Sequence, residues 1–319
     1  MKPRQYVWLF AVLAFSFNVL AGHHEKDEAM QKAVLVTGAN SGLGLRMTQE
    51  LSKNGFYVYA GVLHKQEMKV MNEMDNVTAV QFDVRNQAEV DAAVKFVEAQ
   101  GRGLYGLINN AGVAVFGPMV EMPVETLQYQ FDVNVMGPFR VTQAFAPMIM
   151  ASKGRIATTG SIAGILSSPL FGAYAMSKHA IEAYTDALAA EMARFDVSVH
   201  VIEPGNYASN IGNAALKLIN ETNYWTDDSL YRKERDGLKK RVSQVSKGAD
   251  PIDVAKVALE IMQSEAPRRR YMVTAVASEA EATLRRQLSK MLELNNSQAN
   301  HLDRAGMIKL LDEEIAKAK

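Results

Sequence analysis

Short apolar runs alternate with longer amphipathic stretches from residue 33 onward, and this alternation constrains the fold more than any other sequence feature. Strands that alternate with helices form right-handed βαβ units. The sequence therefore predicts an α/β fold, with a doubly wound parallel sheet of about seven strands and helices on both faces. Helices are predicted over residues 42–54, 86–100, 124–148 and 172–194. Strands are predicted over residues 33–38, 56–63, 77–84, 106–112, 154–161, 197–205 and 269–276.

Three segments stand apart from this alternation. Residues 206–250 lie between the last two predicted strands, and their helical pieces and apolar side chains predict a small lid. Residues 279–319 predict a charged helical tail after the sheet. The main domain therefore covers residues 30–278, and residues 1–29 precede it.

The first 29 residues differ from all that follow. Lys2 and Arg4 precede an apolar run over residues 6–21, which ends in small residues before a polar stretch. A basic start, an apolar centre and a small-residue end are the three parts of a secretory signal peptide. The segment therefore predicts export, or membrane anchoring if it stays uncleaved. A start at Met30 would instead give a cytoplasmic protein, and both interpretations stay open.

The charge balance and the absence of cysteine exclude several classes of protein. The chain has 35 basic and 35 acidic residues, so it carries no net charge that would favour nucleic acid. Without cysteine, disulfides, thiolate metal sites and cysteine nucleophiles are excluded. The six histidines are scattered and lack metal-binding spacing on a helix. We therefore expect neither a nucleic-acid partner nor a metal site.

A glycine-rich segment, TGANSGLGL, follows the first predicted strand directly. Three residues separate Gly38 from Gly42 and one separates Gly42 from Gly44, which is not the G-x-G-x-x-G pattern of a dinucleotide site. Glycines at a strand-to-helix turn nevertheless let main-chain N–H groups and a helix N-terminus approach a pyrophosphate. A turn without a ligand is the alternative interpretation.

Polar groups also end the third and fourth predicted strands. Asp83 follows the third strand, where its carboxylate is placed to accept a hydrogen bond from an adenine amino group. A helix N-cap is the alternative role for Asp83. The motif NNAG, residues 109–112, ends the fourth strand in a tight turn next to the expected ribose. Ligands of open parallel sheets bind at these carboxyl ends.

Tyr174 and Lys178 stand four residues apart in a segment predicted as helix, so their side chains share one helix face. A neighbouring ammonium lowers the pKa of a phenol from its reference value of about 10, which makes tyrosine usable as an acid and base. The same spacing also occurs without function on solvated helices. The pair alone therefore does not decide between the two interpretations.

Several separated motifs together resemble those of the short-chain dehydrogenase/reductase family. Ser161 precedes Tyr174 by 13 residues and Asn110 precedes Asn134 by 24, intervals similar to those of the family. The resemblance spans residues 33–276 and is strongest toward the steroid and retinol dehydrogenase branch. The motifs are the glycine loop, Asp83, NNAG, Asn134 in FDVNVMG, Ser161 in TTGSIAG, YAMSK over 174–178, and EPG over 203–205.

The resemblance implies a Rossmann-type fold and a set of site residues. Tyr174 would exchange a proton with the substrate oxygen, and Lys178 would lower the pKa of Tyr174 and bind the nicotinamide ribose. Ser161 would polarise the substrate oxygen, and Asn134 would hold a water of the proton relay. The residues that the resemblance places around the cofactor are Gly38, Asn40, Ser41, Gly42, Leu43, Gly44, Leu63, His64, Asp83, Val84, Asn110, Ala111, Gly112, Tyr174, Lys178, Pro204, Gly205 and Ser209.

The implied activity is NAD(P)-dependent interconversion of an alcohol with a ketone or aldehyde, on a bulky apolar substrate, by a homodimer or homotetramer. Any membrane contact is expected through the N-terminal segment only. A catalytically silent cofactor-binding scaffold or regulator is the alternative, against which the complete Asn, Ser, Tyr and Lys set argues. NAD-selective sites usually carry an acid after the second strand. Here Leu63, His64 and Lys65 follow instead, and the loop residue Asn40 is neutral, so we expect NADP(H) over NAD(H).

Overall fold

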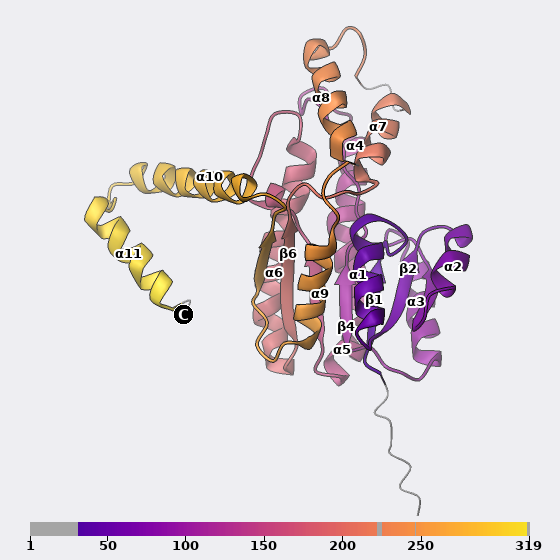
Figure 1. Ribbon diagram of the computed structural model, residues 1–319. Helices are drawn as coiled ribbons and strands as arrows, with labels where there is room; N and C mark the ends of the chain where they lie inside the picture. The colour runs from indigo at the N-terminus through magenta and orange to yellow at the C-terminus, as the bar shows by residue number, and fades with distance from the viewer. Residues whose placement is uncertain (1–30, 222–224, 246, 318–319) are drawn as a thin grey trace, which may run out of the picture. The chain divides into compact units, whose positions relative to one another are not determined.

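The structure of the protein is a computed structural model, which describes residues 31–221, 225–245 and 247–317 (Figure 1). The chain divides into two units, Met1–Met30 and Gln31–Lys319. The predicted signal peptide or anchor falls in the first unit and lies outside the described residues. None of the described helices combines the length and the hydropathy that a membrane crossing requires.

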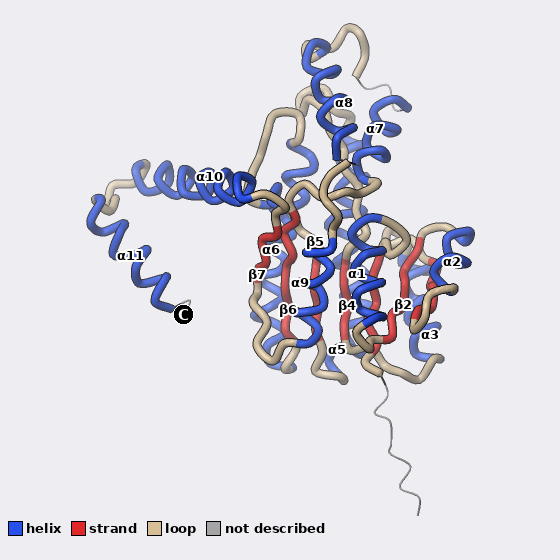
Figure 2. Tube along the Cα trace, viewed as in Figure 1, coloured by secondary structure: helices blue, strands red, loops and turns tan. Residues whose placement is uncertain are grey.

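One sheet of seven parallel strands forms the centre of the second unit, within the described residues (Figure 2). Every neighbouring pair of strands is parallel, and each predicted run contains one of the strands. The predicted α/β fold is therefore confirmed. The strands are, in sheet order, β3 (Val77–Gln81), β2 (Tyr57–Val62), β1 (Ala33–Thr37), β4 (Gly106–Asn109), β5 (Arg155–Thr159), β6 (Ser198–Pro204) and β7 (Arg270–Val273).

Two hydrophobic cores hold helices against both faces of the sheet. Side chains alternate along β1, so Val34 packs into one core and Leu35 into the other, and both are fully buried. Each such burial contributes about 1.5–3 kcal/mol. The first core lies under α1 (Gly42–Lys53) and α9 (Ile252–Gln263), and the second under α3 (Gln87–Ala99), α5 (Gly137–Ala151) and α6 (Gly172–Met192).

The helix predicted over residues 124–148 is interrupted, which corrects the sequence prediction. A π-helical turn, Asp132–Met136, joins α4 (Val124–Phe131) to α5. Asn134 in this turn accepts a hydrogen bond from the main-chain N–H of Val113 at 2.8 Å and donates to its carbonyl at 2.9 Å. Single π turns inside helices are frequent at functional sites. Apolar periodicity does not reveal one, because the flanking helical turns keep their spacing.

The lid and tail segments are helical, as predicted. The segment 206–250, predicted as a lid, contains α7 (Ile211–Glu221) and α8 (Arg232–Val245). The segment 279–319 contains most of α10 (Ala277–Asn296) and all of α11 (Arg304–Lys317). A short helix after β2, α2 (Lys65–Asn72), was not predicted.

The order of the strands creates a crevice between β1 and β4. From β1 the chain proceeds through β2 and β3 toward one edge, and from β4 it proceeds through β5, β6 and β7 toward the other. The loops that follow β1 and β4 therefore run apart, and open sheets of this kind bind their ligands at that point. The glycine loop and the NNAG motif border this crevice.

Candidate active site

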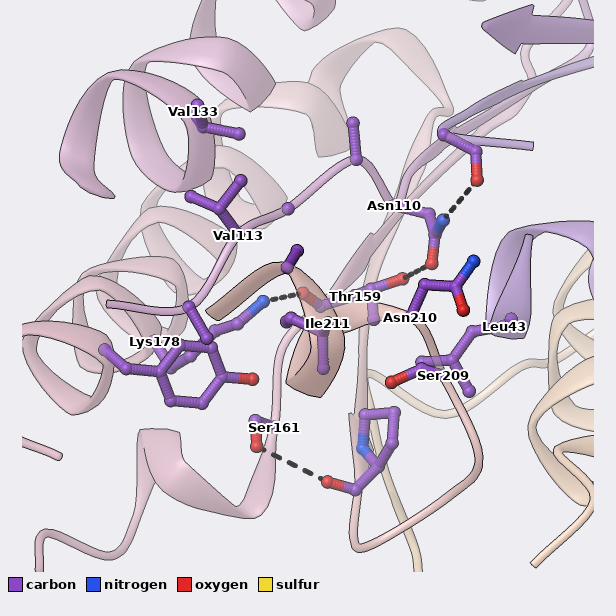
Figure 3. A pocket seen from close by; sticks show the side chains of 18 of the residues that line it. Leu43, Asn110, Val113, Val133, Thr159, Ser161, Lys178, Ser209, Asn210 and Ile211 are labelled. Atoms are coloured by element: carbon purple, nitrogen blue, oxygen red, sulfur yellow. Dashed lines mark hydrogen bonds between the residues drawn. The ribbon is translucent and has the colours of Figure 1, made fainter. Parts of the chain in front are cut away.

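A cavity of about 570 Å³ opens at the carboxyl end of the sheet, around the crevice between β1 and β4 (Figure 3). Most residues predicted for the site line it, but Gly44 and Asn134 do not. The structure therefore brings together in one wall residues that are far apart in sequence. The predicted residues in the lining are Gly38, Asn40, Ser41, Gly42, Leu43, Leu63, His64, Asp83, Val84, Asn110, Ala111, Gly112, Ser161, Tyr174, Lys178, Pro204, Gly205 and Ser209.

The glycine loop turns sharply from β1 into α1. Gly38 and Gly42 have φ angles of +63° and +51°, which residues with a Cβ rarely adopt. Gly44 instead permits close packing, because a Cβ there would overlap the carbonyl oxygen of Gly38. Ser41 is the N-cap of α1 but makes no side-chain capping bond, so it leaves the first N–H groups of α1 available. The turn therefore presents an uncapped helix N-terminus, which suits an anion.

The NNAG motif is tied to the end of β1. The Thr37 hydroxyl accepts hydrogen bonds from the main-chain N–H groups of Asn110 and Ala111, each at 2.9 Å. The Asn110 side chain donates to the carbonyl of Thr37 at 3.0 Å and to that of Gly38 at 3.2 Å. These bonds fix both sides of the crevice relative to each other. Thr37 was not among the predicted site residues.

Ser161 and Tyr174 form the chemically reactive part of the wall. Both side chains line the cavity, and Ser161 interacts with the Tyr174 phenol. The Ser161 hydroxyl donates to the Pro204 carbonyl at 3.4 Å. Burial raises the pKa of Tyr174, while the interaction with Ser161 acts in the opposite direction. The sequence predicted a lowered pKa from Lys178. The structure corrects that expectation, because removal of the phenol from water outweighs its other interactions.

Lys178 lies on the same face of α6 as Tyr174, as predicted. Its ammonium is 5.7 Å from the centre of the Tyr174 ring and donates to the Thr159 carbonyl at 2.7 Å. Burial lowers the pKa of Lys178 to about 8, and the Glu182 carboxylate opposes this shift. The hydrogen bond to Thr159 therefore fixes the amine beside the phenol. Because burial lowers its pKa, the Lys178 ammonium loses its proton more readily than an exposed lysine does.

Asn134 does not line the cavity but is hydrogen-bonded to the segments that form this wall. In addition to its two bonds to Val113, its side chain donates to the Ser177 hydroxyl at 3.2 Å. The Ser177 hydroxyl in turn donates to the main-chain carbonyl of Tyr174 at 2.7 Å. The π turn therefore connects the loop after β4 with the first turns of α6.

The end of β2 holds a carboxylate that the sequence analysis missed. Glu67, on α2, accepts from the Asn40 side chain at 2.8 Å and from the main-chain N–H of His64 at 3.0 Å. Glu67 lines the cavity together with His64 and Leu63, and Leu63 is 46% exposed. Glu67 stands three residues after the N-cap His64, as in a capping box, but histidine is not a residue of the usual capping-box sequence pattern, so this contact leaves little signal in the sequence.

Asp83 lines the cavity as predicted, and its carboxylate forms an ion pair with Arg85. Arg85 donates to it from Nε at 3.0 Å and from Nη2 at 2.6 Å, and this pair lowers the pKa of Asp83. The alternative N-cap role was wrong, because Asn86 caps α3 through bonds to Ala88 and Glu89.

The lid contributes fewer groups to the cavity than its composition suggests. The lid residues that line it all lie at the start of the segment: Asn206, Tyr207, Ser209, Asn210, Ile211 and Ala214. Ser209 lies against the glycine loop, since a Cβ on Gly42 would stand 3.1 Å from the Ser209 Cβ. Trp225 and other apolar lid residues instead pack in a separate core with α7 and α8. Across the described parts of the chain, no three His, Asp or Glu side chains converge as metal ligands.

The tail also reaches the cavity, which no local pattern indicated. Glu279, in the first turn of α10, lines the cavity and accepts from the main-chain N–H of Asn206 at 3.3 Å. Because 73 residues separate these partners, only the tertiary structure reveals the contact.

Comparison with known proteins decides the family. The family model described as short chain dehydrogenase matches residues 32–217, more than half of the chain. The protein belongs to the short-chain dehydrogenase/reductase family. The complete strand order and the lining of the cavity agree with this assignment.

Relatives of this short-chain dehydrogenase include enzymes of the expected kind. It is 34% identical to the uncharacterized oxidoreductase YbbO of Escherichia coli (strain K12), over 78% of this chain and 88% of that protein. It is 34% identical to the 3beta-hydroxysteroid dehydrogenase dhs-16 of Caenorhabditis elegans, over 66% of this chain and 58% of that protein. A short chain dehydrogenase/reductase of Burkholderia phymatum, solved in complex with NAD, is similar with a TM-score of 0.70 and 25% identity, over 82% and 95% of the two chains.

These findings confirm the predicted family, with its steroid-dehydrogenase-like branch. The protein is an NAD(P)-dependent oxidoreductase that acts on CH–OH groups. These relatives are named as an oxidoreductase and a dehydrogenase, which argues against the alternative of a catalytically silent scaffold.

Proposed function

We propose that this dehydrogenase interconverts a bulky apolar ketone or aldehyde with the corresponding alcohol, and that Tyr174 is its general acid and base. The observation that carries the proposal is that Ser161, Tyr174 and Lys178 lie together in the wall of one cavity, at the carboxyl end of the sheet. A substrate oxygen placed at the Ser161 and Tyr174 pair meets two hydroxyl groups. One polarises the oxygen and the other exchanges a proton with it.

The cavity fits a nicotinamide dinucleotide beside this pair. Gly38 and Gly42 line the cavity and let their neighbours pack closely, because a Cβ would stand 3.0 Å from Ala111 and 3.1 Å from Ser209. The uncapped N-terminus of α1 would hold the pyrophosphate, and Lys178 and Asn110 would bind the nicotinamide ribose. When bound, the cofactor supplies or accepts the hydride.

The protein's own part of the chemistry is the movement of a proton. The raised pKa of Tyr174 keeps the phenol protonated at neutral pH, so the group is ready to donate to a carbonyl oxygen. In the reductive direction, this protonated phenol donates to the carbonyl oxygen. Ser161 fixes the carbonyl oxygen, and the ammonium of Lys178 stabilises the phenolate that remains after transfer. Asn134 acts as a positioning residue through its side-chain bonds to Val113 and Ser177.

The size and lining of the cavity support an apolar substrate. Phe116 stands 4.4 Å from Phe171 and 6.0 Å from Tyr174, measured between ring centres. Leu166 and Ile211 also line this end of the cavity. A few polar groups in an otherwise apolar pocket orient a substrate that is itself mostly apolar.

We also propose a preference for NADP(H). Leu63 and His64 at the end of β2 offer no carboxylate, and Lys65 supplies a positive charge at the start of α2. Glu67 works against a 2′-phosphate, but its two oxygens already accept bonds from Asn40 and from the His64 N–H. The expected preference is therefore small, on the order of 1 kcal/mol, the scale of one exposed charge pair.

Two further proposals concern the whole protein. Exposed apolar side chains on α4, the π turn and the start of α5 support assembly into a homodimer or homotetramer; Val124, Met136 and Phe139 are 63%, 45% and 48% exposed. Light scattering tests this. Export or anchoring through residues 1–29 also remains a proposal, which cell fractionation and N-terminal sequencing test.

The proposed function is tested with a panel of apolar ketones and aldehydes, assayed with NADPH and NADH. We expect turnover of bulky cyclic ketones that is faster with NADPH. Turnover confined to small polar carbonyl compounds, or no turnover of any carbonyl compound, would count against it.

A further inference from the structure

The last helices of the chain lie outside the matched family region, yet one of their side chains enters the cavity. The match ends at residue 217, and α10 begins at Ala277. Glu279, in the first turn of α10, accepts from the Asn206 N–H, and a Cβ on Gly205 would overlap the same carboxylate oxygen. The carboxylate therefore stands against the loop that directly follows β6.

This position is close to the reacting end of the cavity. The Ser161 hydroxyl approaches the carbonyl of Pro204, and Gly205 is the next residue along the chain. The other carboxylates in the described lining, Glu67 and Asp83, lie at the opposite end, after β2 and β3. Within the described lining, Glu279 is thus the carboxylate that a substrate held by Ser161 would meet.

The helix α10 is fixed at a second point, which holds Glu279 in place. Lys290 donates from Nζ to the main-chain carbonyl of Ile165 at 2.6 Å and lies 3.4 Å from the His179 ring. Ile165 ends the short turn that Ser161 caps. Lys290 is about 16 Å along the helix from Glu279, at 1.5 Å per residue. The helix therefore spans the rim from the β6 loop to the Ser161 turn.

The contacts of Glu279 leave one of its carboxylate oxygens able to accept a further hydrogen bond. Glu279 occupies the third position of α10, and its main-chain N–H donates to the Val276 carbonyl at 3.2 Å, but its carboxylate makes no capping bond to the Val276 N–H among the described contacts. The described residues provide Oε2 with the Asn206 N–H and provide Oε1 with neither a hydrogen bond nor an ion pair. An ionised carboxylate can only accept, so a ligand that satisfies Oε1 must be a hydrogen-bond donor.

We infer that Glu279 is a specificity-determining residue that accepts a hydrogen bond from a hydroxyl or ammonium group of the substrate. This inference rests on the proposed function, and it narrows the substrate class. The substrate is an apolar ketone or alcohol that carries a second, donor group near its reacting carbon. A hydrogen bond to a charged group is worth about 1.5–3 kcal/mol, which corresponds to a preference of roughly 10- to 150-fold.

The test uses three ketones on one cyclic apolar skeleton, with hydrogen, a hydroxyl group or an ammonium group at the same second position. The value of kcat/KM is measured for the parent, Glu279→Gln and Glu279→Ala. Glu281→Gln is the matched control, because Glu281 lies on the same helix but pairs with Arg285 and is exposed. We expect the parent to favour a donor-bearing ketone over the plain one at least tenfold, and Glu281→Gln to keep this ratio.

In Glu279→Ala the ratio is expected to fall to about one. Glu279→Gln should keep part of the preference for the hydroxyl-bearing ketone, because a neutral amide oxygen still accepts a hydrogen bond from a hydroxyl. It should lose the preference for the ammonium-bearing ketone, because the amide carries no charge that attracts an ammonium. Thermal unfolding of each variant checks that it is folded. If Glu279→Ala is destabilised, the ratio measured for the isosteric Glu279→Gln variant decides the test.

Three outcomes would overturn the inference. One is a parent enzyme without preference for the donor-bearing ketones. Another is a ratio that stays the same in both Glu279 variants. The third is an unchanged ratio with an increased KM for NADPH, which would assign the carboxylate to the cofactor. In each of these cases turnover of the plain ketone leaves the proposed function standing, whereas a parent that reduces no ketone would contradict both.

Discussion

Replacement of Gly44 by alanine is expected to displace the start of α1 from the turn that follows β1. The added Cβ would overlap the main-chain carbonyl of Gly38 and stand 2.6 Å from Nδ2 of Asn110, which itself donates to that carbonyl. A carbon and a carbonyl oxygen normally stay about 3.3 Å apart. The obstacle is main chain, so the start of α1 must move by about 1 Å rather than a side chain turning away.

The cost follows from two opposing effects. Overpacking of this kind costs about 1–3 kcal/mol, whereas alanine favours a helix over glycine by roughly 1 kcal/mol. We therefore expect a net loss of up to about 2 kcal/mol in the free energy of unfolding. The displaced N–H groups of α1 should also weaken binding of NADPH by tenfold or more, since they form the anion site.

Urea denaturation measures the loss of stability, and nucleotide fluorescence measures the Kd for NADPH. Gly237→Ala in α8 is the matched control, because a Cβ there would meet no atom within 4 Å. This control should gain up to about 1 kcal/mol from helix propensity and keep its Kd. A Gly44→Ala protein with the parent's urea midpoint and Kd would refute the close packing described for the loop.

Three other perturbations have defined outcomes. Because burial lowers the pKa of Lys178 to about 8, kcat/KM should fall as the pH rises through about 8 and the ammonium is lost; a flat profile up to pH 10 would argue against this. Burial and Glu182 raise the pKa of Glu203 above 4.5, so the contribution of Glu203 to stability is full below pH 4.5 and declines as the pH rises toward the raised value. Glu203→Gln should remove that decline in urea midpoints, and an equal decline in both proteins would contradict it. Leu63→Asp should shift the kcat/KM ratio toward NADH, and a parent that already prefers NADH tenfold would show that the proposed cofactor preference is wrong.

The fold could be predicted because its signals are local. Each strand is a short apolar run, and the helices between strands carry apolar side chains at helical spacing. The π turn around Asn134 was not predicted, since its cause is a tertiary contact: the side chain of Asn134 binds the main chain of Val113. Helix α2 was missed for a different reason, because its eight residues are too short to establish a period.

The candidate site could be predicted where motifs carry it, and not where distant segments meet. The glycine loop, NNAG and the Tyr174 helix all line one cavity, as their order in the sequence suggested. The direction of the Tyr174 pKa shift was wrong, because the sequence shows the neighbouring Lys178 but not the burial of the phenol. Glu279 could not be predicted, since its approach to Asn206 depends on how α10 leaves β7.

The most direct test of the proposed mechanism is the kcat of Tyr174→Phe for reduction of an apolar ketone with NADPH. The substitution removes one oxygen and leaves the ring in its place against Phe116. General acid–base groups typically contribute 10²–10⁴-fold, so kcat should fall by about that factor. The Kd for NADPH and the urea midpoint should stay close to those of the parent. A Tyr174→Phe enzyme whose kcat remains within a few-fold of the parent would contradict the assignment of Tyr174 as the general acid and base.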